Sequence, residues 1–468
     1  MSRIYLSYDP DQRLLLPPDL REWLPEGHLA LFISDVVDEL DLSPIVRMYE
    51  SGDGRGRPPY HPLMMVKLLV YGYCIGRVSS RKIEKATYED VAFRVLACNQ
   101  HPDHDSIAEF RKRHLQELAR LFVQVLRLCE QAGLMKLGHV AIDGSKLRAN
   151  ASKHKAMSYE RMCEKEQQLA SEVARLLAEA QEADEAEDKQ YGKGHRGDEL
   201  PAELARRESR LRKIREAKAA LEEEARQRAA VAAAEVEAKI QARKKLAEES
   251  GKKARGPSPQ VVNVAEAKPE PKAQRNFTDP ESRIMKDSAT GSFEQSYNAQ
   301  IAVDGEAQII VAAGLTQAAN DKQQLVPLLE EVKNNVGRLP EKVTADAGYF
   351  STTAVTNEAL SGIDLYVTPD RGKKTEQVEE SSEERPAPVE VAKAVTEMRE
   401  KLKTSEGREV YKQRKMIVEP VFGQVKEVRG FRRFSFRGLR KNEAEWQLVC
   451  LTHNLLKLFR GRPCPQPA

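Results

Sequence analysis

The sequence predicts a mixed α/β protein in which a helical N-terminal region precedes a sheet that is interrupted by a long helical insertion. Three observations lead to this prediction. Apolar residues recur at spacings of three and four up to about residue 135, as on amphipathic helices. Short apolar strands occur near residue 140 and again from about residue 275. Between them, residues 155–260 are dominated by Ala, Glu, Lys and Arg, which is typical of long surface helices.

Residues 1–135 form the predicted helical domain. Its helical segments are HLALFISDVVDEL, HPLMMVKLLVYGYC, EDVAFRVLAC and ELARLFVQVLRLCEQAGL. Turn-rich basic segments separate them: GDGRGRPPYHP contains Arg57, and NQHPDHDSIAEFRKRH contains Arg111, Lys112 and Arg113. Short helices that end in a basic one are compatible with a helix-turn-helix-like DNA-binding domain. They are equally compatible with a helical bundle that exposes a basic face to solvent.

Residues 155–260 are predicted to form an antiparallel helical hairpin with a coiled-coil seam. Apolar residues recur mostly at spacings of seven, four and three on two arms, which a glycine-rich turn, DKQYGKGHRGDELP, separates. The seam residues are Met162, Leu169, Val173, Leu176 and Ala180 on the first arm and Leu204, Leu211, Ile214, Leu221 and Ala225 on the second.

The predicted sheet is assembled from residues 136–154 and 275–370. The first range supplies one strand, HVAI, and the second supplies a hairpin, SYNAQIAVD with QIIVAAGLT, followed by the strands in KVTADAGYF and IDLYVTPD. A helix, DKQQLVPLLEEVKNNVG, separates the hairpin from the later strands. Residues 371–395 are acidic, polar and proline-bearing, which indicates a linker. Residues 396–460 are predicted to form C-terminal helices.

Two carboxylates stand at the ends of apolar strands, and a third acid follows on a later helix. Asp143 ends the first strand, Asp346 ends the strand in KVTADAGYF, and Glu419 lies in the C-terminal helices. Each acid alone has an ordinary interpretation, since a strand-end Asp often serves a turn and Glu419 is one of many helical glutamates. Strand-end acids in a mixed sheet can converge where α/β folds bind ligands.

Converging carboxylates repel each other unless cations neutralise them. Hard oxygen ligands favour Mg²⁺ or Mn²⁺, and a pair of such ions about 3.5–4 Å apart can clamp a phosphodiester. The sequence therefore predicts a site with two divalent ions for phosphoryl transfer. Lys146 and Arg148 follow Asp143 directly and are placed to hold a phosphate.

Other polar residues are assigned to turns and helix caps. His101 and His104 lack a further His or Cys at metal-ligand spacing, so a turn with a cap is favoured there over a metal site. Asp304 fits a hairpin turn, and Asp321 fits the start of a helix.

The composition limits the class of protein. Charged residues make up 31% of the chain but the net charge is only +3, so any nucleic-acid surface must be local. The six cysteines lie far apart without metal-ligand spacing, which indicates reduced thiols in a cytoplasmic protein. The N-terminal residues lack the apolar core of a signal peptide, and the chain has no long apolar stretch. We therefore expect a soluble cytoplasmic protein without a membrane partner.

The segments AIDGSKLRANAS, YNAQIAVD, VTADAGYFS and YKQRKMIVEPVFGQVKEVRGFRRFSFRGL resemble the DDE transposases of bacterial insertion sequences. The likeness is strongest to the group whose helical N-terminal domain contains a GRPPYHP-type segment, and it covers nearly the whole chain. It implies an RNase H-like core in which Asp143, Asp346 and Glu419 form the catalytic triad and the metal ligands. It further implies Mg²⁺-dependent cleavage of DNA at the terminal inverted repeats, attack of the freed 3′-OH on target DNA, and a homodimer in the synaptic complex.

The family signature around the third acid is matched with one departure. The signature spaces Tyr, Arg, Glu and Lys by two, three and six residues, and this chain has Tyr411, Arg414, Glu419 and Lys426. Four residues separate Arg414 from Glu419 instead of three. On a straight helix Arg414 falls on the flank of the apolar stripe, whereas Lys415 and Lys426 lie near Glu419. The helix geometry therefore predicts that Lys415, and not Arg414, accompanies the third acid.

DNA contacts are expected from basic and polar residues in three regions. These residues are Lys146 and Arg148 after the first strand, Tyr411, Arg414, Lys415, Lys426, Arg432, Arg433 and Arg437 near the C-terminus, and Arg57, Arg111, Lys112 and Arg113 in the N-terminal domain. Two other functions use the same residues: an RNase H-like nuclease or repair enzyme without strand transfer, and a non-catalytic DNA-binding descendant. The intact triad disfavours the descendant, and the extra helical domain favours recognition of specific DNA ends over general nuclease action.

Overall fold

The structure is a computed structural model that describes residues 19–50, 58–191, 202–250, 263–287, 291–355, 357–369 and 389–461. It separates into two compact units. The core unit comprises Met1–Leu147 and Asn298–Ala468, and the insertion unit comprises Arg148–Tyr297. Arg57 and most of the predicted linker at 371–395 lie outside the described residues.

The core unit begins with a series of short helices, as the periodicity predicts. Their starts are fixed by side chains that accept hydrogen bonds from free backbone N–H groups: Asp90 from Ala92 and Phe93, and Asp103 from Ser106. The helices are η1 (Leu20–Trp23), α1 (Leu29–Glu39), α2 (Ser43–Glu50), α3 (Pro62–Cys74), α4 (Ser80–Glu89), α5 (Val91–Leu96), α6 (His104–Arg113) and α7 (Leu115–Gln131).

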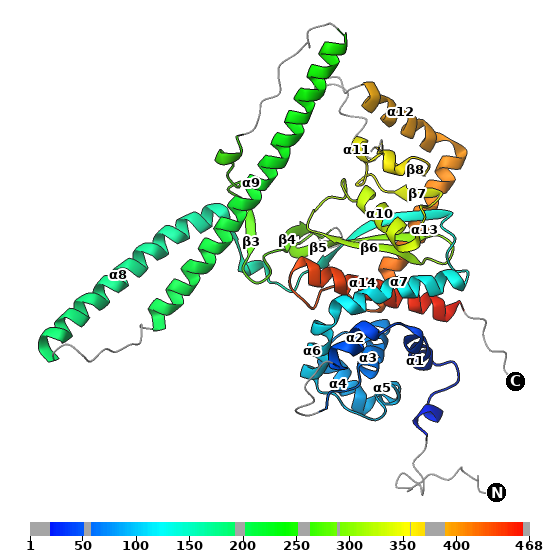
Figure 1. The fold of residues 1–468 in the computed structure, drawn as a ribbon, viewed down its shortest axis with the longest axis horizontal. Helices are drawn as coiled ribbons and strands as arrows, with labels where there is room; N and C mark the ends of the chain where they lie inside the picture. Colours follow the sequence, from blue (N-terminus) through cyan, green and yellow to red (C-terminus); the bar gives the residue numbers. More distant parts are fainter. Residues whose placement is uncertain are drawn as a thin grey trace, which may run out of the picture. The chain divides into compact units, whose positions relative to one another are not determined.

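These N-terminal helices share their hydrophobic core with the last helix of the chain. Helix α14 (Leu439–Arg460) packs against α3 and α7, and α7 and α14 run side by side in Figure 1. Inside this contact, Tyr73 of α3 donates a hydrogen bond of 2.7 Å to Glu445 of α14. Residues 1–135 therefore depend on α14 for part of their packing.

The sheet of the core unit is mixed, as predicted. Strands β5, β1, β7 and β8 lie in that order, and β6 pairs with β5. The pairs β1–β7 and β7–β8 are parallel, whereas β5–β6 is the predicted antiparallel hairpin. The strands are β1 (His139–Arg148), β5 (Phe293–Asp304), β6 (Ile310–Thr316), β7 (Lys342–Ala345) and β8 (Asp364–Val367).

Helices on the sheet complete the core unit. Helices α10 and α14 contact β6, α12 contacts β8, and α13 contacts both β7 and β8. Helix α13 turns its buried residues, including Ile417, Val418 and Val421, toward the interior. These elements, with the short helices after β7, are α10 (Leu325–Val336), α11 (Thr352–Val355), η4 (Glu358–Leu360), α12 (Val389–Lys403), α13 (Ser405–Gly423) and the π-helical turn η5 (Gln424–Val428).

The insertion unit is built on two long helices, α8 (Tyr159–Tyr191) and α9 (Ala202–Ser250). Tyr159 bonds to Glu222, Glu166 pairs with Arg215 and Lys218, and Glu172 pairs with Arg207, so the two helices run antiparallel along this stretch. The turn between them, residues 192–201, lies outside the described residues.

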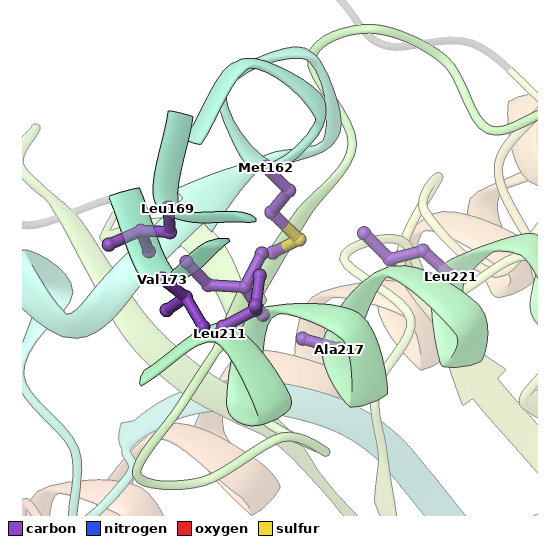
Figure 2. Packing of buried hydrophobic residues seen from close by; sticks show 7 residues of the cluster. Met162, Leu169, Val173, Leu211, Ala217 and Leu221 are labelled. Atoms are coloured by element: carbon purple, nitrogen blue, oxygen red, sulfur yellow. The ribbon is translucent and has the colours of Figure 1, made fainter. Parts of the chain in front are cut away.

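The contact between α8 and α9 encloses a small hydrophobic core (Figure 2). Most of its members are residues of the predicted seam, while Leu176 is partly buried against it. The seam residues Ala180 and Leu204 have side chains outside the described part. The buried members are Met162, Leu169, Val173, Leu211, Ile214, Ala217 and Leu221.

Short strands and turns complete the insertion unit. Strand β2 (Ala156–Ser158) pairs with β3 (Gln274–Asn276), and β4 (Arg283–Lys286) pairs with the beginning of β5. Two short helical turns complete the unit: η2 (Lys153–Lys155) comes directly before β2, and η3 (Val264–Glu266) lies between α9 and β3 in the sequence. Within the described ranges of the whole chain, no helix is both long and apolar enough to span a membrane.

Candidate active site

Strand register brings Asp143 and Asp346 together. In the parallel pair β1–β7, Ile142 lies opposite Ala345, so each aspartate follows a paired residue on a neighbouring strand. Asp143 Oδ1 accepts a hydrogen bond of 2.9 Å from the N–H of Gly144, and Asp346 Oδ1 accepts one of 2.7 Å from the N–H of Gly348. Asp346 follows the last residue of β7, whereas β1 continues past Asp143 to Arg148, so the expectation that the first strand ends at Asp143 is wrong. The two aspartates meet where the β1–β7 pairing ends, and we call this place the strand ends.

Arg414 of α13 is the cation beside Asp143. Its Nη1 lies 3.7 Å from Asp143 Oδ2, and its side chain is only 11% exposed and packs over the ring of Tyr411. Arg414 lies against the interior, as its place on the flank of the apolar stripe predicts, but there it approaches Asp143, because the apolar face of α13 packs on β7 and β8. A residue on the flank of that face reaches the strand ends, whereas Lys415 points to solvent and is exposed.

The environment of Asp143 raises the pKa of its carboxyl group. Burial raises the pKa of Asp143 to about 6, and the nearby charges of Asp346 and Asp321 add to the rise. The Arg414 guanidinium and the Gly144 N–H act in the opposite direction and lower the pKa. Carboxylates whose pKa is shifted by burial and by nearby charges are common at functional sites, so Asp143 is a candidate for one.

Asp321 is the acid that the sequence analysis missed. It was assigned to a helix start, but α10 begins only at Leu325, and Asp321 Oδ1 instead accepts hydrogen bonds of 2.7 Å from both Asn298 Nδ2 and Gln300 Nε2. The signal was present in the segment YNAQ. Asn298 and Gln300 are two apart on β5, so both amides lie on one face of the strand and need a shared acceptor.

Glu419 is not placed with these acids. It is exposed on α13, and the charged groups that shift the pKa of Asp143 are Arg414, Asp346 and Asp321. One residue more than the family spacing rotates Glu419 by about 100° from the position one turn after Arg414. The buried Val418 occupies that position.

Lys426 is tied to the backbone that follows Asp143. Its Nζ donates hydrogen bonds to the Ser145 hydroxyl and, at 3.3 Å, to the carbonyl of Lys146. Lys426 belongs to the π-helical turn η5, whose wider turn shifts the apolar register so that Val428 is 76% exposed. Lys426 and Arg414 thus approach the same part of β1, residues 143–146, from one C-terminal segment.

The remaining basic candidates differ in exposure. Arg111 is buried and donates to the Tyr73 hydroxyl and the Val78 carbonyl, so its predicted contact with DNA is wrong. It follows Ile107 and Phe110 on the buried face of α6, where its charge lies near Glu445. The exposed candidates are Lys112, Arg113, Lys415, Arg432, Arg433 and Arg437, while Lys146, Arg148 and Tyr411 are partly exposed.

The residues assigned to turns and caps are placed as predicted, apart from Asp321. Asp304 accepts hydrogen bonds from the N–H groups of Leu137 and Glu306 at the β5–β6 turn. His104 opens α6 beside Glu84, and His101 bonds to Thr87.

The donor chemistry at the strand ends fits a hard divalent cation. Asp143, Asp321 and Asp346 bring carboxylate oxygens together, and oxygen donors of this kind suit Mg²⁺ or Mn²⁺. In the part of the chain that the structure describes, no three His, Cys, Asp or Glu side chains form a ready-made metal group. Asp143 faces Arg414 and Asp321 faces two amides, so metal binding would require Asp143 to exchange Arg414 for the cation.

Two family models match the chain. A transposase domain (DUF772) matches residues 18–113, which hold α1–α6, and a transposase DDE domain matches residues 260–455. The chain is a DDE transposase of the insertion-sequence type. No curated protein and no solved structure matches it.

The matched DDE segment contains most of the residues gathered at the strand ends. Asp321, Asp346 and Arg414 lie within residues 260–455, as does Glu419, whereas Asp143 precedes the segment. Asp143 lies on β1, which precedes the matched segment but pairs in parallel with β7 inside it. Both paired stretches belong to the core unit.

Proposed function

We propose that the transposase binds the terminal inverted repeats of its element, cleaves the DNA there, and joins the freed 3′-OH ends to target DNA. The core unit then acts as an RNase H-like fold, with Asp143, Asp346 and Glu419 as its triad and metal ligands, and Glu419, which is exposed on α13, would have to approach the two aspartates to complete it. The observation that carries this proposal is the register of β1 and β7, because it sets Asp143 and Asp346 side by side at the end of the β1–β7 pairing in a transposase.

Two transfers at phosphorus account for the reaction. In the first, a water oxygen attacks the phosphodiester at the element end, the P–O3′ bond breaks, and a 3′-OH is released. In the second, this 3′-OH attacks a target phosphodiester, forms a new P–O3′ bond, and releases the target's own 3′-OH. Mg²⁺ or Mn²⁺, as a pair of ions, would supply charge neutralisation and activation of the attacking oxygen.

The residues of the chain bind and orient the DNA. Arg414 is held over Tyr411 beside Asp143, so its guanidinium can pair with the phosphate once a cation replaces it at Asp143. Lys426 holds the backbone after Asp143 and adds positive charge there. Exposed basic side chains would bind neighbouring phosphates, and they comprise Lys112, Arg113, Lys415, Arg432, Arg433 and Arg437, with Lys146, Arg148 and Arg57 as further candidates.

Partner and location follow from the same chemistry. Element ends come in pairs, so the transposase would act as a homodimer that holds two ends in a synaptic complex. Its DNA substrate places this action in the cytoplasm. A nuclease without strand transfer and a DNA-binding descendant without cleavage are the alternative outcomes.

The test uses the full chain and duplexes taken from the DNA that flanks its coding region. Asp143→Asn, Asp346→Asn and Glu419→Gln are each expected to abolish cleavage in Mg²⁺ while DNA affinity stays within about threefold, because phosphate binding rests on Lys and Arg. Glu409→Gln, at an exposed site on the same helix α13, is the matched control and should cleave normally.

Each result has one meaning. Full cleavage by any one of the three variants removes that residue from the triad. Cleavage by wild type without joined product indicates the nuclease, and binding without cleavage indicates the non-catalytic descendant.

A further inference from the structure

Asp321 lies against the two backbone segments that carry the strand-end acids. A Cβ atom added at Gly144, directly after Asp143, would lie 2.9 Å from Asp321 Oδ1. A Cβ atom added at Gly348 would lie 3.3 Å from Asp321 Oδ2 and 2.8 Å from Asp346 Oδ1. The Asp321 carboxylate therefore fits between these two segments, in space that two glycines leave open.

A buried hydrogen-bond network fixes the orientation of this carboxylate. Asn298 and Gln300 are 2% and 1% exposed, and both donate to the same oxygen, Oδ1. Gln300 Oε1 in turn accepts a hydrogen bond from the hydroxyl of Tyr349, three residues after Asp346. The segments YNAQ and DAGY thus hold Asp321 by one oxygen.

The second oxygen of Asp321 is left for another ligand. Among the described residues, Asn298 and Gln300 account for the hydrogen bonds to Asp321, and both reach Oδ1. Oδ2 lies on the side of Gly348 and Asp346. Asp321 is partly exposed, and its Oδ2 is not among the buried unpartnered atoms of the described residues, so a cation from solvent can reach this oxygen.

The charges at this site are unbalanced. Among the described residues, the carboxylates of Asp143, Asp321 and Asp346 lie together, Arg414 is the cation that acts on Asp143, and Glu419 is exposed. A divalent cation would neutralise the excess, and a fixed carboxylate oxygen is a suitable ligand for it. Asp321 is better placed to act with Asp143 and Asp346 than Glu419 is.

We propose that Asp321 is a catalytic carboxylate of this transposase, supplying Oδ2 to the divalent cation alongside Asp143 and Asp346. The proposal rests on the proposed function, because it places a further ligand in the same metal centre. Asn298 and Gln300 are its positioning residues: they hold Oδ1 and direct Oδ2 toward the strand ends.

The first experiment titrates the metal-free full chain with Mn²⁺ and follows free Mn²⁺ by electron paramagnetic resonance, without DNA. Asp321→Asn retains an oxygen that can accept both amide bonds, so it removes the charge and Oδ2 while preserving the network. Its Mn²⁺ affinity is expected to fall at least tenfold. Asp105→Asn, at a side chain that is 91% exposed, is the matched control and should bind as wild type does.

The variants distinguish the two proposals. If Asp143→Asn loses affinity tenfold and Asp321→Asn stays within twofold of wild type, Asp321 is a structural residue and the inference is overturned. If Asp143→Asn and Asp346→Asn also bind as wild type does, the metal centre of the proposed function is itself wrong.

A second experiment needs no variant and therefore does not depend on folding of Asp321→Asn. Fe²⁺ with ascorbate and peroxide cleaves a polypeptide close to the bound metal, and mass spectrometry locates the cuts in wild type. Cuts that excess Mg²⁺ suppresses are expected near residues 143, 321 and 346. Cuts near 143, 346 and 419 without any near 321 would overturn the inference.

Discussion

Replacing Arg414 tests the arrangement of α13 on the strand ends. Arg414→Met keeps most of the length of the side chain and removes the cation 3.7 Å from Asp143. At this separation and an effective dielectric constant of about 20, the gross attraction is roughly 4 kcal/mol. Asp143 is 23% exposed, which screens the pair, so we expect the free energy of unfolding to fall by about 2 kcal/mol.

The assay is urea unfolding followed by circular dichroism at neutral pH with a chelator present. Arg414→Lys separates charge from packing, because it keeps the cation and should recover about half of the loss. Lys415→Ala, at the exposed neighbouring residue, should change stability by less than about 0.5 kcal/mol. Strand transfer at equal folded protein should follow the same order, with Arg414→Met affected more than Lys415→Ala. Equal stability of Arg414→Met and wild type, or a larger effect of Lys415→Ala, would refute this arrangement.

Three further predictions concern stability. Burial lowers the pKa of His453 to about 3 from its usual 6.5, so the unfolded chain takes up a proton that the folded chain does not, and stability is lost as pH falls from about 6.5 toward 3. Urea unfolding at pH 7 and at pH 5 measures this effect. Between these two pH values the free energy of unfolding should fall by about 2 kcal/mol less in His453→Gln than in wild type. Tyr73→Phe leaves Glu445 without its buried hydroxyl donor and should lower the free energy of unfolding by about 1–3 kcal/mol. Ile214→Ala opens a cavity in the core between α8 and α9 and should destabilise the insertion unit by about 2–4 kcal/mol, seen as earlier loss of helical signal on heating.

Matched controls accompany these variants. Tyr88→Phe, at a side chain that is 58% exposed, and Val231→Ala on α9, at one that is 63% exposed, should leave stability within about 0.5 kcal/mol of wild type. Equal effects of Tyr73→Phe and Tyr88→Phe would contradict the buried network. Equal losses of stability in Ile214→Ala and Val231→Ala would contradict the packing of the hydrophobic core between α8 and α9. If His453→Gln loses as much stability as wild type between pH 7 and pH 5, the buried imidazole of His453 is not held neutral in the folded chain.

The sequence predicted the strand-end acids because strand periodicity is local information. Apolar runs before Asp143 and Asp346 specify strands, and parallel pairing of these runs then places the two aspartates together, although β1 continues beyond Asp143 to Arg148. The β5–β6 hairpin was predictable for the same reason, since its turn and both strands are contiguous.

Residues whose position depends on tertiary packing were misjudged. A helical wheel gives the angle between Arg414 and Glu419 but not which strands the apolar face of α13 meets, and that contact decides which of them reaches Asp143. Asp321 was missed because its partners, Asn298 and Gln300, lie on a different strand. The burial of Arg111 could have been predicted from the sequence, because its helical spacing from Ile107 and Phe110 places it on the apolar, buried face of α6.

The most direct test of the metal centre is an anomalous difference map from crystals of the full chain grown with Mn²⁺. We expect a Mn²⁺ peak within coordination distance of carboxylate oxygens from both Asp143 and Asp346. A map at saturating Mn²⁺ with no peak between these two residues, or with peaks only at other acids, would contradict it.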